Sequence, residues 1–234
     1  MTDLGSRIRE IELKISEAAR RSGRNAEEVA LMAVTKTRSL VEIEKAWDAG
    51  IRLFGENRVQ EAAIKIEKWP QERVSEWRLI GHLQRNKARK ALVLFSRIES
   101  LDRLDLAEDL ERILAEKGGE IDALVEVNTS GEISKHGVSP GGLEGLLENI
   151  LRTCPSVKLK GLMTVGPLEG SQARVAEAFG LLRELGERMS GNLGLKISEL
   201  SMGMSDDFEM AIEQGSTCVR LGRALFGPRE YREV

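Results

Sequence analysis

The feature that most constrains the fold is an alternation, repeated eight times, between short apolar segments and amphipathic helical segments. The predicted strands are 29–35, 52–55, 77–82, 98–100, 121–127, 160–165, 197–200 and 218–221. Such alternation implies parallel strands joined by right-handed crossovers. Eight units in 234 residues favour a closed (β/α)₈ TIM barrel in the α/β class. Segments 52–55 and 98–100 are weak, so pattern alone leaves an open doubly wound sheet as the alternative.

An extra helix precedes the first strand. Leu4, Ile8, Ile11 and Ile15 follow helical spacing and predict an amphipathic helix at the N-terminus. No linker or low-complexity segment divides the chain. We therefore expect a single barrel domain over residues 1–234.

Composition excludes several classes of function. Hydrophobic residues make up 41% and charged residues 31%, and the net charge of −3 gives no overall attraction to nucleic acid or to an anionic membrane. The start of the chain has no apolar block typical of a signal peptide, which predicts a cytoplasmic protein. Cys154 and Cys218 form no disulfide framework, and with only two histidines no metal site is expected. We expect a monomer.

Residues that suit a phosphate group follow the last two strands. Barrel enzymes place their sites at the C-terminal ends of the strands and bind phosphate in the loops after strands seven and eight. Ser201 and Gly203 follow the seventh strand, while Arg220 and Gly222 end the eighth. Small residues let backbone N–H groups approach an anion, and Arg220 adds a cation. The alternative is that these glycines only end helices and turn the chain.

Polar residues also follow the first three strands. Lys36 ends a strand that is apolar on both faces, where burial favours the neutral amine that attacks an aldehyde. A lysine in this position is otherwise a solvated surface residue. Asn57 and His82 are candidate ligand contacts, with turn and packing roles as the alternatives. Lys135, in the polar loop 130–137, is expected to be exposed, with movement of this loop over the site as the alternative.

Six sequence blocks, taken together and in order, resemble a known family. They are AVTKT (33–37), FGEN (54–57), LIGHLQ (79–84), LMT (162–164), LSMGMSD (200–206) and VRLGRALFG (219–227). The blocks resemble the pyridoxal phosphate homeostasis proteins. The resemblance implies a barrel similar to the N-terminal domain of alanine racemase, with pyridoxal 5′-phosphate (PLP) held as a Schiff base on Lys36. It also implies that Arg220 contacts the pyridine nitrogen, the phosphate or both.

The resemblance implies a non-catalytic carrier and regulator of PLP, with PLP-dependent apoenzymes as candidate partners. Racemisation needs a second acid or base on the opposite face of the cofactor, which alanine racemase takes from a separate domain. The one tyrosine here, Tyr231, lies three residues from the end. A PLP-dependent racemase or decarboxylase remains the first alternative, and an aldolase that uses Lys36 without a cofactor the second.

Overall fold

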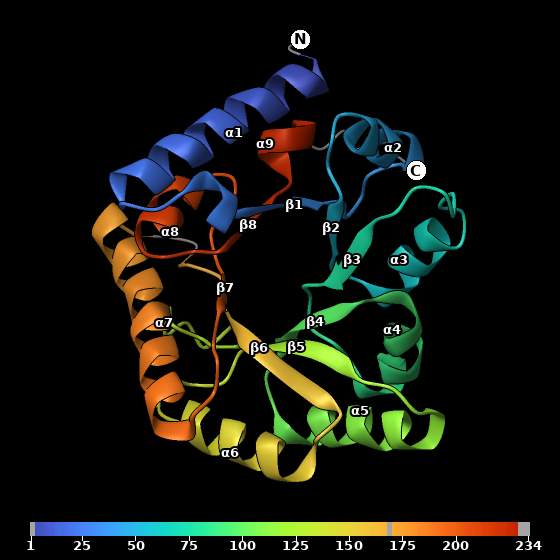
Figure 1. Ribbon diagram of the computed structural model, residues 1–234, viewed down its shortest axis with the longest axis vertical. Coiled ribbons are helices and arrows are strands. Elements are labelled where there is room, and N and C mark those ends of the chain that lie inside the picture. The colour runs from blue at the N-terminus through green and yellow to red at the C-terminus, as the bar shows by residue number, and fades with distance from the viewer. Residues whose placement is uncertain (1–2, 168–169, 229–234) are drawn as a thin grey trace.

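The computed structural model, which describes residues 3–167 and 170–228, is a closed barrel of eight parallel strands (Figure 1). The strands are β1 (Ala30–Val34), β2 (Leu53–Glu56), β3 (Glu76–Leu79), β4 (Arg97–Leu101), β5 (Ile121–Glu126), β6 (Val157–Met163), β7 (Glu199–Ser201) and β8 (Cys218–Leu221). Each strand pairs with its neighbour in sequence, and β1 also pairs with β8. The prediction of a (β/α)₈ barrel is confirmed, and the open sheet is excluded.

Helices surround the barrel on its outside (Figure 1). They are α1 (Leu4–Arg21), α2 (Leu40–Asp48), α3 (Val59–Ile66), α4 (Ala88–Leu94), α5 (Leu104–Lys117), α6 (Leu143–Thr153), α7 (Gln172–Leu193), α8 (Phe208–Glu213) and α9 (Arg223–Phe226), with short 3₁₀ turns at Ala26–Glu28 and Arg85–Lys87. The predicted extra helix is α1, which packs across α8 and α9. Ile8, Ile11 and Ile15 are buried there.

The weak fourth strand is stabilised by polar contacts that its sequence pattern does not reveal. Every residue of β4 is buried, including Glu99 and Ser100. Glu99 accepts hydrogen bonds from Arg78 and Ser201, and Ser100 donates to the Gly81 carbonyl oxygen. Polar groups of the barrel interior thus replace the apolar residues expected of a central strand.

The third strand is shorter than predicted. It ends at Leu79 rather than at residue 82. A Cβ atom on Gly81 would lie 2.4 Å from the Asn57 carbonyl oxygen, so only glycine permits this approach of the two loops. His82 therefore lies in the loop beyond the strand.

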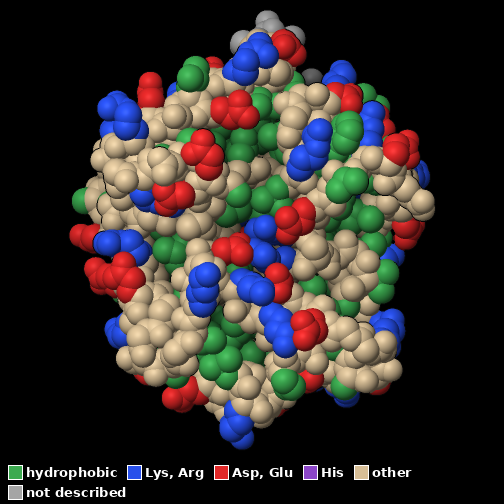
Figure 2. All heavy atoms as spheres, viewed as in Figure 1, with side chains coloured by type: hydrophobic (Ala, Val, Ile, Leu, Met, Phe, Trp, Pro, Cys, Tyr) green, Lys and Arg blue, Asp and Glu red, His purple; other side chains and the backbone are tan. Residues whose placement is uncertain are grey.

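Acidic and basic side chains are interspersed over the surface. Figure 2 shows both signs across the visible face, with a mixed group at its centre. In the basic run 85–90, Arg85 pairs with Asp109 and Arg89 with Glu116. Among the described residues, no helix is long and apolar enough to cross a membrane.

Candidate functional site at the mouth of the barrel

Lys36 lies on a strained turn directly after β1. Thr35 is fully buried, and Lys36 is half-buried. Thr37 has a φ of 64°, which makes it the one described non-glycine residue with a positive φ. A β-branched residue in this region costs on the order of 1–3 kcal/mol, so the surrounding structure must hold the turn in place.

A buried set of hydrogen bonds, here called the Lys65 network, holds the first side of this turn. Lys65 on α3 is 8% exposed. Its Nζ donates to the Thr35 carbonyl oxygen at 2.7 Å, to Glu56 Oε1 at 2.6 Å and to Glu61 Oε1 at 2.7 Å. All three donor positions of the ammonium are thereby used. The backbone immediately before Lys36 is fixed to β2 and α3.

The same network holds the other side of the turn. The Thr37 N–H donates to Glu61 Oε1 at 2.6 Å, and the Thr35 hydroxyl donates to Glu56. Burial raises the pKa of Glu56 against the effect of Lys65. Burial also opposes ionisation of Glu61, but hydrogen bonds from Lys65 and Thr37 outweigh it and lower the pKa of that carboxyl. The network fixes the backbone on both sides of Lys36.

A cavity of about 510 Å³ lies beside Lys36 and is lined also by Arg38, Gly222 and Arg223. Two predicted site residues, Lys36 and Gly222, therefore border one space although they follow different strands. The two arginines add positive charge around it. Such a cavity suits a small anionic ligand that a lysine can reach.

Ser201 and Arg220 lie together inside the barrel. Arg220, which is 4% exposed, donates to Ser201 Oγ at 2.8 Å and to the Thr164 carbonyl oxygen at 2.7 Å. Ser201 Oγ in turn donates to Glu99 Oε2 at 2.6 Å. The Ser201 hydroxyl is committed to these two neighbours, so any contact it makes with a ligand has to compete with them.

The backbone conformation and the packing of Gly203, in the loop after β7, explain why this residue is a glycine. Gly203 has a φ of 96°, and a Cβ atom there would lie 2.6 Å from the Ala211 Cβ of α8. Packing alone therefore requires glycine at this position. The loops after β7 and β8 are also joined, because the Ala224 N–H donates to Ser205 Oγ at 3.1 Å.

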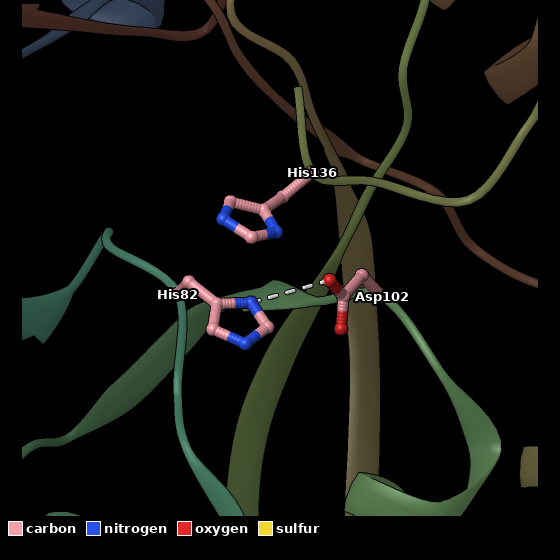
Figure 3. Close-up of side chains that lie close together, drawn as sticks. All are labelled: His82, Asp102 and His136. Carbon is pink, nitrogen blue, oxygen red and sulfur yellow. Dashed lines mark ion pairs between the residues drawn. The ribbon is translucent and has the colours of Figure 1, made fainter. Parts of the chain in front are cut away.

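Asn57 and His82 border a second hollow, of about 770 Å³, together with His136. Asn57 Oδ1 is buried and has no hydrogen-bond partner among the described residues. The His82 and His136 rings stack with their centroids 4.1 Å apart, and His82 Nδ1 lies 3.4 Å from Asp102 Oδ2 (Figure 3). Burial lowers the pKa of His82 against the opposing charge of Asp102.

Glu126, at the end of β5, was missed by sequence reasoning. Its side chain is 8% exposed and makes no hydrogen bond to the described residues. Burial and, to a smaller extent, the nearby Asp102 carboxylate raise its pKa to about 7, against the opposing effect of Arg220. A glutamate after the apolar residues Ala123–Val125, at the C-terminal end of a predicted strand, is the signal that could have identified it.

The expectation that the Lys135 side chain is exposed is wrong. Its side chain is 12% exposed, because Nζ donates to the Gly166 carbonyl oxygen at 2.5 Å and pairs with Glu132 at 3.2 Å. The loop 130–137 folds back over the mouth and satisfies this charge locally.

The class of protein follows from a match over most of the chain. Residues 10–230 match the family described as the N-terminal domain of alanine racemase. Alanine racemase from Clostridium difficile has the same fold, with a TM-score of 0.75 at 14% identity, over 94% of this chain and 56% of that one.

Closer relatives define the group within this class. A pyridoxal phosphate homeostasis protein from Aquifex aeolicus is 39% identical over 93% of this chain and 95% of its own length. PipY from Synechococcus elongatus, solved with PLP bound, is 34% identical with a TM-score of 0.82, over 96% of this chain and all of that one. The chain belongs to the alanine racemase N-terminal domain family and, within it, to the pyridoxal phosphate homeostasis proteins. The predicted resemblance is confirmed.

Proposed function

We propose that this protein binds PLP as a Schiff base on Lys36 and acts as a non-catalytic carrier and regulator in PLP homeostasis. The observation that carries the proposal is Lys36 itself, held by the Lys65 network at the edge of a cavity that two arginines line. The names of the relatives and the PLP bound to PipY support it.

The residues at the mouth fit this cofactor. PLP supplies an aldehyde, which reacts with a lysine amine, and a phosphate, which binds cations and backbone N–H groups. Lys36 provides the amine, while Arg38, Arg223 and the backbone at Gly222 surround the same cavity. Asn57 Oδ1 is a buried acceptor that a ligand donor could satisfy.

Of the remaining predicted contacts, Arg220 and Ser201 lie inside the barrel, below the mouth. Arg220 is held by Ser201 and Thr164, so its guanidinium has one defined orientation beneath the mouth. We propose that it binds the cofactor and that Ser201 positions it. We also propose that His82, in the loop after β3, and Gly203, in the loop after β7, border the bound cofactor.

The proposal also includes the compartment, the oligomeric state and the partners of the protein. A carrier has to share the compartment of the enzymes it serves, so we propose a cytoplasmic monomer, one domain over residues 1–234, that exchanges PLP with PLP-dependent apoenzymes.

Tyr231, considered above as a racemase acid, lies outside the described residues. The carrier proposal predicts negligible formation of D-alanine from L-alanine by the loaded protein, measured by chiral chromatography. Efficient formation that is lost in Lys36→Ala would establish the racemase instead.

The absorption spectrum tests PLP binding through Lys36. Purified protein given PLP should show a visible band that survives desalting, and Lys36→Ala should lose it while keeping the circular dichroism of the wild type. Lys90→Ala, at a half-exposed lysine outside the mouth, is the matched control and should keep the band. A band retained in Lys36→Ala would overturn the covalent assignment, and a colourless wild type unaffected by PLP would favour the cofactor-free aldolase.

A further inference from the structure

The two histidines of the chain meet at one corner of the barrel mouth, beyond the cavity at Lys36. His82 follows β3, and His136 enters from the long loop after β5 (Figure 3). Their rings stack with an interplanar angle of 17°, and Asp102, which follows β4, lies beside His82. Three different loops therefore bring two imidazoles and a carboxylate together.

We propose that His82, Asp102 and His136 form a binding site for a divalent transition-metal ion of the zinc class. One ligand atom from each residue lies within 4.8 Å of the other two. In a tetrahedral Zn²⁺ site, where each bond is about 2.0–2.2 Å long, two ligand atoms lie about 3.4 Å apart. The cluster thus needs to contract by at most about 1.4 Å, and the stacked rings need to turn until one nitrogen of each points at the ion, which the exposure of both histidine side chains allows.

The positions of His82 and Asp102 are fixed by one arginine. Arg103 Nη1 donates to Asp102 Oδ1 at 2.6 Å, and Nη2 donates to the Leu83 carbonyl oxygen at 2.9 Å. Asp102 is thereby tied to the His82 loop with its other oxygen, Oδ2, facing the imidazole. Fixing a ligating carboxylate through its second oxygen is what the outer partners of metal sites do.

The base of the His136 loop is equally well defined. Val127 bridges to Val138, and the Asn128 N–H donates to the Val138 carbonyl oxygen at 2.9 Å. Gly137 has a φ of 108°, and a Cβ atom there would lie 2.7 Å from the Asn128 nitrogen. The residue next to His136 is therefore held in a conformation that only glycine permits.

The donor set defines the ion and its coordination. Two imidazoles and one carboxylate favour zinc-class ions over Mg²⁺ or Ca²⁺, which prefer oxygen ligands. Three protein ligands leave a fourth position open, as in sites that bind water or a small ligand. The hollow of about 770 Å³ beside His82 and His136 provides the space for it. This site uses none of Lys36, Arg220 or Gly222, but it shares His82 with the proposed PLP site, so it has to be tested on PLP-free protein.

Metal titration of untagged, full-length, PLP-free protein after chelator treatment tests the proposal. Zn²⁺ followed by calorimetry should saturate at one ion per chain, and Co²⁺ should give a visible spectrum typical of nitrogen and oxygen ligands. Proton NMR adds a sharper readout, because the chain has two histidines and both imidazole signals should shift together up to one equivalent. His136→Asn should weaken binding by at least about tenfold.

Two matched variants separate this site from other binding. Asp206→Asn removes an exposed carboxylate of the β7 loop, and Lys36→Ala removes the proposed PLP attachment; both should bind the ion like the wild type. Absence of saturation with millimolar Zn²⁺, or unchanged affinity in the His82→Asn/His136→Asn double variant, would show that the histidines only stack on one another.

Discussion

The two sides of the barrel mouth differ in how their buried charged groups are paired. On the β1–β2 side, Lys65 meets Glu56 and Glu61 at hydrogen-bonding distance and holds the turn that carries Lys36. On the β3–β5 side, Asp102 and Glu126 are two carboxyl groups whose charges repel each other, and Glu126 has no hydrogen bond to the described residues. The first side pairs its buried lysine with two carboxylates and so provides rigid geometry, although Glu56 Oε2 and Asn57 Oδ1 have no hydrogen-bond partner among the described residues. The second holds polar groups that a ligand would satisfy.

Removing the charge at the centre of the Lys65 network should have the largest effect. Lys65→Met leaves Glu56, Glu61 and the Thr35 carbonyl oxygen without their buried partner, which should lower the free energy of unfolding by about 3–5 kcal/mol. Urea denaturation measures it. Lys90→Met, at an exposed pair with Glu67, is the control and should change it by at most about 1 kcal/mol. Equal effects in the two variants would contradict the contrast between a buried network and a surface pair.

Sequence patterns predicted the barrel because strands buried on both faces are apolar, as Ala30–Val34 is. They also predicted that strand ends would share a site, and Lys36 and Gly222 do border one cavity. They could not predict the pairing of Ser201 with Glu99, which are 102 residues apart and meet only when the barrel closes. The stacking of His82 on His136 depends in the same way on how two loops fold.

Neutralising Glu126 should have the next largest effect and should depend on pH. Folding raises the pKa of Glu126 from 4.5 to about 7, so the folded protein keeps a proton that the unfolded chain releases. The stability of the wild type therefore falls as pH rises through this window, by roughly 3 kcal/mol at most.

Glu126→Gln should match the stability of the wild type near pH 4.5 and exceed it increasingly up to about pH 8, as measured by urea denaturation of PLP-free protein. The exposed Asp206→Asn is the control and should track the wild type at each pH. A constant difference between Glu126→Gln and wild type would show that Glu126 does not titrate in this range.

Arg220 lies between the two sides and should show the smallest effect in free energy. A charge-assisted hydrogen bond contributes about 1.5–3 kcal/mol, so Arg220→Gln should weaken PLP retention by about tenfold or more. Equilibrium dialysis measures it. Arg89→Gln, at an exposed pair with Glu116, should retain PLP like the wild type. Unchanged affinity in Arg220→Gln would limit Arg220 to its contacts with Ser201 and Thr164.

The covalent role of Lys36 is tested most directly by locating the adduct. PLP-loaded wild-type protein is reduced with borohydride, digested and mapped by mass spectrometry. The rigid turn at Lys36 and its cavity predict one reduced adduct per chain, on the peptide that contains Lys36. An adduct found mainly on another lysine, such as Lys135 in the loop over the mouth, would contradict the assignment.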